Sequence, residues 1–152
     1  MHYKFELNTD NPLGSSGEVL SALAELWYSM WNKSTNYSYV NPSQFKKVFC
    51  NHSPMYMGYQ QHDSAEFLAQ LLDYMHEDVN RVKEKKYVEM PDLQGTDEQQ
   101  ATTFWELHLQ RNQSFIVDLM QGQYKSTVQC AECKHKKATF DAFTTVQLPI
   151  PY

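Results

Sequence analysis

The spacing of apolar residues changes once along this chain, close to Gly122, and this change constrains the fold more than any other feature. Before it, apolar residues recur at intervals of three and four, which is the period of an α-helix. After it, the segments QYKSTVQC and KATFDAFTTVQLPI are rich in threonine, valine and aromatic residues that partly alternate, as in β-strands. Helices first and strands last indicate an α+β fold rather than repeated βαβ units.

Two helices are expected in the first third of the chain. The first spans about residues 17–32, because Ser15 and Glu18 have the spacing of a capping box ahead of an apolar period. The second follows the Asn-Pro pair at 41–42, which offers an N-cap and a first-turn proline, and it is expected to end at Phe49. The core is expected to include three aromatic residues of the first helix: Trp27, Tyr28 and Trp31.

The longest helix is expected to begin near Asp63. Asp63 and Glu66 have capping-box spacing, since Asp63 can accept from the amide at the third helical position while Glu66 reaches back to the cap. Both carboxylates also suit the positive end of the helix dipole. The helical period predicts a buried stripe of Phe67, Leu68, Leu71, Leu72, Met75 and Val79. The same period leaves a polar set in water: Asp73, Glu77, Asp78, Asn80 and Arg81.

The remaining segments are expected to form a linker, a helix and a hairpin. Residues 82–95 are polar and charged, which predicts a surface linker or insertion. Thr96 and Gln99 have capping-box spacing at the start of a further helix. Strands are expected over residues 123–130 and 137–150, joined by a tight turn in CAECKHKK. Two strands without neighbours leave unpaired edges, so this part is expected to be the least stable.

Composition excludes several classes of function. The chain has 152 residues, of which 41% are hydrophobic, so it is long enough to bury a sizeable core. Its net charge of −5 lacks the basic footprint of a nucleic-acid-binding protein. MHYKFELNTD has no apolar region typical of a signal peptide, and no apolar run is long enough to span a membrane. We therefore expect no nucleic-acid or membrane partner, and an intracellular location that is cytoplasmic and/or nuclear.

Three cysteines, Cys50, Cys130 and Cys133, fit a reducing compartment better than a disulfide framework. Cys130 and Cys133 form a C-x-x-C on the expected hairpin turn, which is the spacing of half a tetrahedral zinc site. The alternatives are a redox pair, which belongs at a strand-to-helix turn, and two thiols without metal. No second C-x-x-C completes the site, and His135 is the candidate for a third ligand. Cys50 falls at a helix end and is interpreted as structural.

The segment QQHD at the start of the longest helix raises a separate question. Capping accounts for Asp63 and Glu66 without any function. It does not account for Gln60, Gln61 and His62, which are poor capping residues immediately upstream. An acid–base pair of His62 with Asp63 is disfavoured, because adjacent residues seldom form a productive dyad and no nucleophile is close in sequence. From the residues alone, capping is the preferred interpretation of this segment.

Three stretches resemble the ubiquitin-specific proteases, which are papain-like cysteine proteases that remove ubiquitin. GYQQHDSAEFLAQLLDYMHEDVNR resembles the QQD box of that family. NTDNPLGSSGEVLSALAELWYSMW resembles the Asn-Pro-Leu-Gly segment and helix that precede this box. SFIVDLMQGQYKSTVQCAECKHKKATFDAFTTVQLPIP is similar to the entry into the zinc-ribbon fingers. The resemblance covers nearly the whole chain and keeps the order of the three stretches.

The resemblance implies part of a fingers–palm–thumb fold, namely thumb helices followed by the first β-hairpin of the zinc-ribbon fingers. All of residues 1–152 would then belong to one catalytic domain. Within it, the resemblance implies a helical thumb part at 1–81, a linker or insertion at 82–95, a helical connector at 96–122 and strands of the fingers and palm at 123–152.

The resemblance also implies binding residues. In the family, acidic residues of the QQD box bind the arginine-bearing C-terminal tail of ubiquitin. The matching positions are Asp63 and Glu66, with Gln60, Gln61 and His62 beside them. A pair of carboxylates suits this role, because a desolvated guanidinium requires charge-assisted, preferably bidentate hydrogen bonds. The expected partners are therefore ubiquitin and ubiquitinated proteins.

The C-x-x-C and the catalytic residues follow from the same resemblance. Cys130 and Cys133 match the first zinc-ligand pair of the fingers, so a structural zinc is implied with only half of its site in this chain. The family's catalytic cysteine lies in an upstream Asn-Thr-Cys box, and its histidine lies in a downstream box. No residue of this chain is therefore assigned as catalytic, and Cys50 does not occupy the nucleophile position.

The preferred hypothesis is thus the central part of a deubiquitinating cysteine protease, which hydrolyses the (iso)peptide bond at the C-terminus of ubiquitin. These 152 residues alone are expected to be inactive. The alternatives are a non-catalytic ubiquitin-binding module and a small zinc-knuckle interaction protein.

Overall fold

The computed structural model describes residues 2–32, 39–87 and 95–151. The chain divides into two compact units, Met1–Lys83 and Glu84–Tyr152, called here the N-terminal unit and the C-terminal unit. The expected linker at 82–95 lies partly outside the described residues, and its described ends are not in a helix or strand. Helices together with one small sheet confirm the mixed α and β character expected from the sequence. Among the described residues, no helix has the length and apolar character that crossing a membrane requires.

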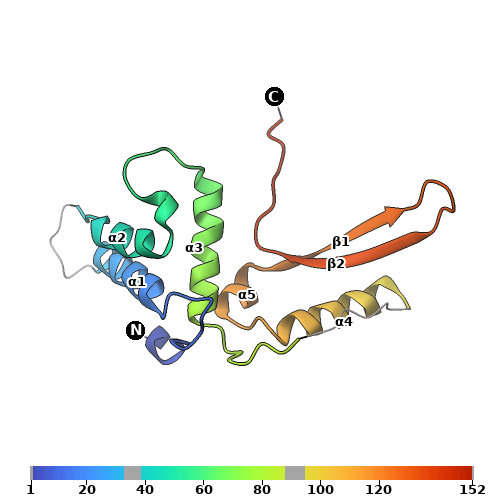
Figure 1. The fold of residues 1–152 in the computed structure, drawn as a ribbon, viewed down its shortest axis with the longest axis horizontal. Coiled ribbons are helices and arrows are strands. Elements are labelled where there is room, and N and C mark those ends of the chain that lie inside the picture. Colours follow the sequence, from blue (N-terminus) through green and yellow to red (C-terminus); the bar gives the residue numbers. More distant parts are fainter. Residues whose placement is uncertain (1, 33–38, 88–94, 152) are drawn as a thin grey trace. The chain divides into compact units, whose positions relative to one another are not determined.

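The described residues of the N-terminal unit form three α-helices, drawn in blue to green in Figure 1. These helices are α1 (Glu18–Trp31), α2 (Ser43–His52) and α3 (Ser64–Asp78), with short 3-10 turns at His2–Phe5 and Pro54–Tyr56. Helix α1 packs on both α2 and α3. Their apolar faces form the core, which includes Val19, Leu20 and Leu23 of α1, Phe49 and Cys50 of α2, and Leu71, Leu72 and Met75 of α3. Helix α2 continues three residues beyond the end expected from the sequence.

The start of α1 differs from the expected capping box. The N-cap position is Gly17 with φ of 82°, in the left-handed region that favours glycine. The Ser15 hydroxyl accepts a hydrogen bond from the amide of Val19 at 2.9 Å, whereas Glu18 pairs with Nε2 of His52 at 2.9 Å. The capping-box assignment was therefore wrong, because both side chains have partners elsewhere.

A carboxylate from α3 completes this helix start. Asp78 is fully buried and accepts four hydrogen bonds, from the amides of Ser15, Gly17 and Leu20 and from the Ser15 hydroxyl. The two bonds to Ser15 are both 2.6 Å long. Gly14 permits this approach, since a Cβ there would lie 2.9 Å from Oδ1 of Asp78. One aspartate thus fixes the end of α3 against the start of α1.

The polar end of α3 is buried, which corrects the expectation that Glu77, Asp78 and Asn80 stay in water. Asn11 donates to both the carbonyl and a carboxylate oxygen of Glu77, at 2.8 and 2.7 Å. Asn8 donates to the carbonyl of Asn80 at 2.9 Å. The segment before α1 covers this end of α3, and polar groups can be buried there because they are hydrogen-bonded. Asp73 and Arg81 are exposed as expected.

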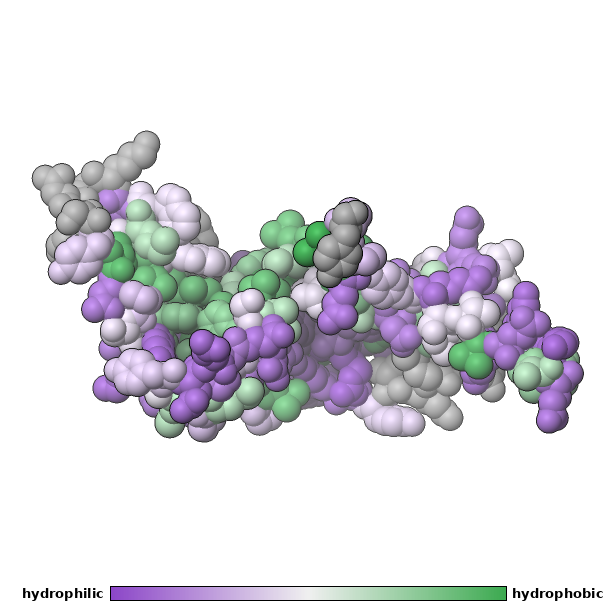
Figure 2. Space-filling view, turned by 90° about the horizontal axis from the view of Figure 1, so that it is seen from above, coloured by the Kyte–Doolittle hydropathy of each residue, from purple (hydrophilic) through white to green (hydrophobic). Residues whose placement is uncertain are grey.

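The C-terminal half of α1 also differs from expectation. Trp27, Tyr28 and Trp31 are 47, 56 and 69% exposed, so they are not core residues. All four buried residues of this helix lie in its first half: Val19, Leu20, Ala22 and Leu23. Leu68 of α3 is likewise 46% exposed rather than part of the buried stripe. Figure 2 shows hydrophobic residues at the surface over the N-terminal unit. Helical spacing predicted the apolar faces, but the packing partners do not cover their full length.

The C-terminal unit combines α4 (Asp97–Leu109) and α5 (Phe115–Met120) with an antiparallel hairpin of β1 (Gly122–Gln129) and β2 (Lys136–Phe143). The capping box predicted for Thr96 and Gln99 is confirmed in both of its hydrogen bonds. Helix α4 packs on the hairpin, where Phe140 is buried and lies 5.8 Å from the ring of Phe104. This contact is at the base of the hairpin, and residues 124–137 are exposed.

The second strand is shorter than expected. It ends at Phe143, whereas the pattern predicted a strand to residue 150. Phe143 pairs with Gly122, the first residue of β1, so β1 offers no partner to the residues that follow. Val146, Leu148 and Ile150 are accordingly exposed. The apolar alternation was present, but a strand requires a hydrogen-bonding neighbour.

Candidate functional site

The polar segment ahead of α3 is an exposed approach to a well-formed helix start. Gln60, Gln61, His62, Asp63 and Glu66 are all exposed, and the structure places them consecutively along this approach and the first turn of α3. Just upstream, Gly58 has φ of 80°, and its carbonyl accepts from Nζ of Lys46 at 2.6 Å. The lysine of α2 therefore anchors the approach to the rest of the N-terminal unit.

Asp63 is the N-cap of α3, as the sequence predicted, but the Glu66 side chain does not reach back to the Asp63 amide, so the predicted capping box is only half formed. Its Oδ1 accepts from the amides of Ala65 and Glu66 at 2.6 and 3.2 Å. The other carboxylate oxygen of Asp63 has no such role in the helix start, and the Glu66 side chain is exposed in the same turn. Two negative charges therefore face solvent where the helix amides are already satisfied. This arrangement can bind a cation through charge-assisted hydrogen bonds.

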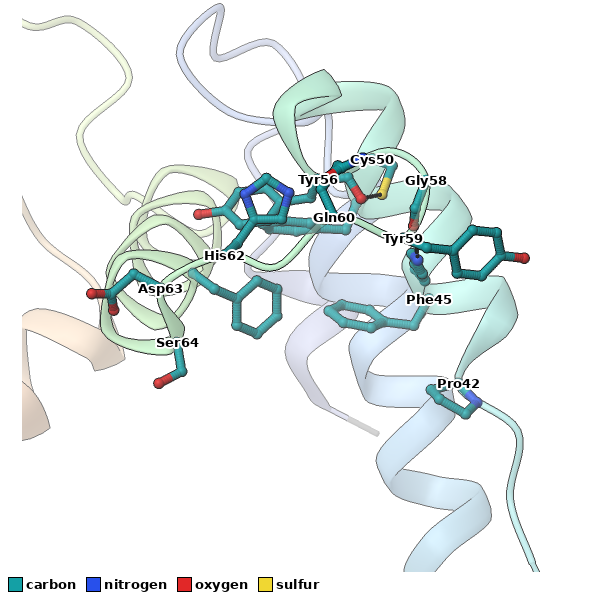
Figure 3. A pocket seen from close by; sticks show the side chains of 13 residues that line it. Pro42, Phe45, Cys50, Tyr56, Gly58, Tyr59, Gln60, His62, Asp63 and Ser64 are labelled. Atoms are coloured by element: carbon teal, nitrogen blue, oxygen red, sulfur yellow. Dashed lines mark hydrogen bonds between the residues drawn. The ribbon is translucent and has the colours of Figure 1, made fainter.

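A pocket of about 430 Å³ lies beside this segment, between α2, the 3-10 turn at 54–56 and the start of α3. Its lining includes the aromatic residues Phe45, Phe49, Tyr56, Tyr59 and Phe67, with Gln60, His62, Asp63 and Ser64 on the side of the polar approach. Figure 3 shows the Asp63 and Ser64 side chains at one side of the pocket and the Tyr59 ring directed away at the other. The candidate site thus joins an apolar pocket to a polar, acidic side.

Tyr56 is the pocket residue whose role could not be read from the sequence. It lies in the 3-10 turn between α2 and α3 and is 8% exposed. Its ring contacts Phe49 and Phe67, with centroids 5.4 and 5.7 Å away. Its hydroxyl is buried and has no hydrogen-bond partner among the described residues. Burial raises the pKa of Tyr56, and the nearby carboxylates of Glu66 and Asp63 raise it further.

Cys50 is a structural cysteine, in agreement with the expectation. It is 6% exposed, and its thiol donates to the carbonyl of Tyr56 at 3.1 Å. The sequence neighbour His52 instead pairs with Glu18. The thiol and the imidazole therefore have separate partners, and this part of the chain offers no activated nucleophile.

The C-x-x-C occupies the hairpin turn between β1 and β2, and both cysteines are exposed. The turn is closed by two backbone bonds, from Cys130 to the carbonyl of His135 and from Lys134 to the carbonyl of Cys130, at 2.9 and 3.1 Å. Hydrogen bonds from the amides of Cys133 and Glu132 lower the pKa of Cys130, and so does one from the Cys133 thiol. Within the described ranges, no group of three or more His, Cys, Asp or Glu residues is placed to hold a metal. His135 therefore does not complete a site.

A family-level comparison identifies the chain. The sequence profile described as "Ubiquitin carboxyl-terminal hydrolase" matches residues 1–148. The chain belongs to the ubiquitin carboxyl-terminal hydrolase family. The family resemblance seen in the sequence is therefore confirmed.

Individual relatives in this hydrolase family are similar over almost the whole chain. Ubiquitin carboxyl-terminal hydrolase 15 of Homo sapiens is 47% identical over 98% of the chain, which covers 15% of that protein. Ubiquitin carboxyl-terminal hydrolase 8 of Arabidopsis thaliana is also 47% identical, with 98% of the chain and 17% of that protein covered. Ubiquitin carboxyl-terminal hydrolase 4 of Bos taurus is 47% identical over 98% of the chain, which covers 15% of that protein. The chain thus spans 15–17% of the length of these hydrolases.

The candidate residues of this hydrolase-family chain fall into two groups. Gln60, Gln61, His62, Asp63 and Glu66 lie together in the N-terminal unit, beside the pocket. Cys130 and Cys133 lie together in the C-terminal unit, at the hairpin turn. Sequence spacing identified both groups, since each one is local in the chain. It did not identify Tyr56, because the lack of a partner for its hydroxyl depends on residues from two helices and a loop.

Proposed function

We propose that this chain forms part of the catalytic domain of a cysteine-type deubiquitinase, which hydrolyses the (iso)peptide bond at the C-terminus of ubiquitin. Family membership and the names of the relatives support this proposal. In it, the N-terminal unit corresponds to thumb helices and the hairpin of the C-terminal unit to the first hairpin of the fingers. Ubiquitin and ubiquitinated proteins are the partners. Three free thiols suit a reducing compartment, which supports a cytoplasmic or nuclear location.

The role assigned to this chain is to bind the arginine-bearing tail of ubiquitin. The observation that supports this role is that the two oxygens of the Asp63 carboxylate have different surroundings. One oxygen satisfies the amides that open α3, while the rest of the group faces solvent beside Glu66. A guanidinium can take bidentate hydrogen bonds from such a pair, and the helix holds the pair in place. Gln60, Gln61 and His62 line the approach and offer further polar groups to a peptide backbone.

We assign a structural rather than catalytic role to the C-x-x-C. A tetrahedral zinc needs four ligands, and the hairpin turn offers the two thiols of Cys130 and Cys133. The lowered pKa of Cys130 favours the thiolate that a metal requires. The described residues do not complete a zinc site, so the remaining ligands belong outside them. Zinc would brace the turn when bound, and no catalytic step passes through it.

The chain by itself is proposed to be inactive, because the nucleophile and general base of the family lie outside it. The buried Cys50 cannot replace them, since its thiol faces a carbonyl rather than a base. Incubation of the 152-residue chain with ubiquitin carrying a fluorogenic C-terminal group tests this point. No release of the fluorophore is expected. Release that survives Cys50→Ser and Cys130→Ser would require a different reaction.

Ubiquitin binding is the direct test of the tail-binding role. Labelled ubiquitin is titrated with the chain and with Asp63→Asn, which keeps a good N-cap but removes the charge. We expect the affinity to fall by about tenfold, because the charge-assisted bonds to arginine are lost. Ubiquitin without its arginine-bearing tail should bind the chain as weakly as full ubiquitin binds the variant.

The matched control is Glu98→Gln. Glu98 is an exposed acid in the first turn of α4, in the other unit, and its helix start is capped in a similar way. Its neutralisation removes the same charge and should leave ubiquitin binding unchanged. If both variants weaken ubiquitin binding equally, the effect of Asp63→Asn is explained by the change in net charge alone. If Asp63→Asn binds ubiquitin as tightly as the original chain, Asp63 is not part of the tail-binding site, even though the chain belongs to the family.

A further inference from the structure

The pocket beside α3 has the size and lining of a small-molecule site. Its volume of about 430 Å³ lies within the range of ligand pockets, which are mostly apolar with a few placed polar groups. Phe45 and Phe49 come from α2, Phe67 comes from α3, and Tyr56 lies in the turn between them. Flat apolar groups of a ligand can pack against such rings. The remaining question is which polar group the ligand carries.

The Tyr56 hydroxyl gives the first part of the answer. It is buried without a hydrogen-bond partner among the described residues, although buried polar groups in proteins almost always have one. Figure 3 shows it on the side of α3, with the His62 imidazole in front of the Tyr56 ring. The two ring centroids are 4.9 Å apart. His62 is exposed, so its ring can turn away from the Tyr56 ring without a change in the backbone.

Charge gives the second part. At the start of α3, the amides of Ala65 and Glu66 donate to Asp63, whose own negative charge occupies the positive end of the helix dipole. Asp63 lines this side of the pocket and Glu66 follows it in the first turn of α3, so this side is acidic. Burial raises the pKa of Tyr56 most, and the two carboxylates raise it further. The positive group that lines the pocket is Lys46, which already donates to the carbonyl of Gly58 and lies 5.1 Å from the Tyr59 ring. The acidic side therefore selects a cation.

We propose that this pocket binds a small organic cation with a flat apolar body. The body packs among the phenylalanine rings of α2 and α3. The cationic N–H groups donate to the Tyr56 oxygen and to the carboxylate of Asp63, after His62 has turned away. This site goes beyond the ubiquitin-tail role, since Tyr56 and the aromatic lining take no part in that role. Because Asp63 belongs to both, bound cation and ubiquitin tail should compete.

Three probes of equal shape test the selection of charge. Benzamidine, benzamide and benzoate share one ring and differ in carrying a positive, neutral or negative group. Each is titrated into the 152-residue chain and binding is measured by calorimetry and by shifts of pocket amides in NMR spectra. Benzamidine should bind at least about fivefold more tightly than benzamide, and benzoate most weakly. Equal or tighter binding of benzoate would overturn the proposal, and so would no saturation at about 10 mM benzamidine.

Two tyrosine variants test the hydroxyl itself. Tyr56→Phe removes the hydroxyl that lacks a partner, so the free chain should melt at a higher temperature while benzamidine binds about three- to tenfold more weakly. Tyr59→Phe is the matched control, because its ring lines the same pocket but the residue is fully exposed. It should change neither quantity. If benzamidine binds Tyr56→Phe as tightly as the original chain, the hydroxyl has no role in ligand binding and the proposal fails.

The same variants separate this site from the ubiquitin-tail site. Tyr56→Phe leaves Asp63 and Glu66 in place, so ubiquitin affinity should stay within twofold of the original while benzamidine affinity falls. Asp63→Asn should weaken both ligands. Loss of ubiquitin binding in Tyr56→Phe, with benzamidine unaffected, would contradict the assignment of the hydroxyl. An intact benzamidine response with no ubiquitin binding at all would contradict only the tail-binding role.

Discussion

The N-terminal and C-terminal units satisfy their polar and apolar groups in different ways. In the N-terminal unit, Asp78 is fully buried and takes four hydrogen bonds from the start of α1. In the C-terminal unit, the outer part of the hairpin is exposed, and the sheet has two strands only among the described residues. The first unit is therefore held by contacts between segments distant in sequence. The hairpin is held mainly by its own ladder and by α4 at its base.

The same difference applies to the candidate binding sites of the two units. The candidate binding groups of the N-terminal unit, Asp63 and Glu66, stand on a helix whose far end is fixed by Asp78. A cation bound there meets groups in fixed positions, which limits the ordering required for binding. The C-x-x-C stands at the exposed end of a hairpin, where zinc would supply the missing constraint. In the proposed roles, the fold would prepare the first site and zinc would prepare the second.

The largest expected effect tests the buried carboxylate. Asp78→Ala leaves several buried donors without an acceptor, so the free energy of unfolding of the N-terminal unit should fall by about 3 kcal/mol or more. Urea unfolding followed by circular dichroism measures this change. The control Asp10→Ala removes an exposed acid of the same unit and should alter stability by about 0.5 kcal/mol at most. Similar losses in both variants would remove the special status of Asp78.

Limited trypsin digestion compares the two units directly. Lys134, Lys136 and Lys137 are exposed at and beside the hairpin turn, and Lys47 is exposed on α2. Because all of these lysines are exposed, the rate of cleavage beside each one reports how often the local backbone opens. The hairpin sites should be cut about tenfold faster than Lys47, because the end of the hairpin has few buried contacts. Faster cleavage at Lys47 would reverse the order of stability. Added zinc should slow cleavage of the hairpin if Cys130 and Cys133 bind it.

A smaller effect is expected from the base of the hairpin. The rings of Tyr124 and Phe143 stack with centroids 3.8 Å apart across the two strands. Tyr124→Ala should weaken the hairpin by about 1 kcal/mol, measured as faster hydrogen exchange of the β1 and β2 amides. Val128→Ala is the control on the same strand, since Val128 is 71% exposed near the turn. Equal effects of the two changes would show that the hairpin has no anchored base.

The smallest expected effect concerns pH. The pKa of Tyr56 is raised above its ordinary value of 10.0 by burial and then by Glu66 and Asp63. The folded chain therefore holds this proton more tightly than the unfolded chain. The resulting contribution to stability is complete below about pH 10 and is lost as the pH rises further. When the pH is raised from 9 to above 10, the melting temperature should therefore fall less for Tyr56→Phe than for the original chain. An identical fall would mean that Tyr56 does not titrate differently on folding.

Much of the local structure could be predicted from the sequence. The N-cap Asp63 and the capping box of Thr96 and Gln99 are formed by residues within three positions of each other, so their spacing was sufficient. The turn carrying Cys130 and Cys133 was predicted for the same reason. The candidate residues Gln60 to Glu66 needed the family resemblance as well. The segment is local, but exposure of polar groups is too common to indicate function by itself.

The failures concern burial rather than helix or strand type. Helical spacing marked Trp27 and Trp31 as apolar and was silent about whether another helix reaches them. The strand pattern continued past Phe143, but the partner strand β1 begins opposite that residue. Each error arose where a local pattern needed a surface from elsewhere in the chain.

The sequence by itself determined the order of helices and hairpin, the helix starts at Asp63 and Thr96, and the family. These depend on residue types at short spacing, where backbone geometry allows few alternatives. The tertiary structure alone decided that the buried Asp78 accepts a hydrogen bond from the amide of Ser15, which lies 63 positions away in the sequence. It also decided that the Tyr56 hydroxyl is enclosed without a partner. Burial and hydrogen-bond satisfaction depend on which distant segments meet, and residue spacing carries no information about that meeting.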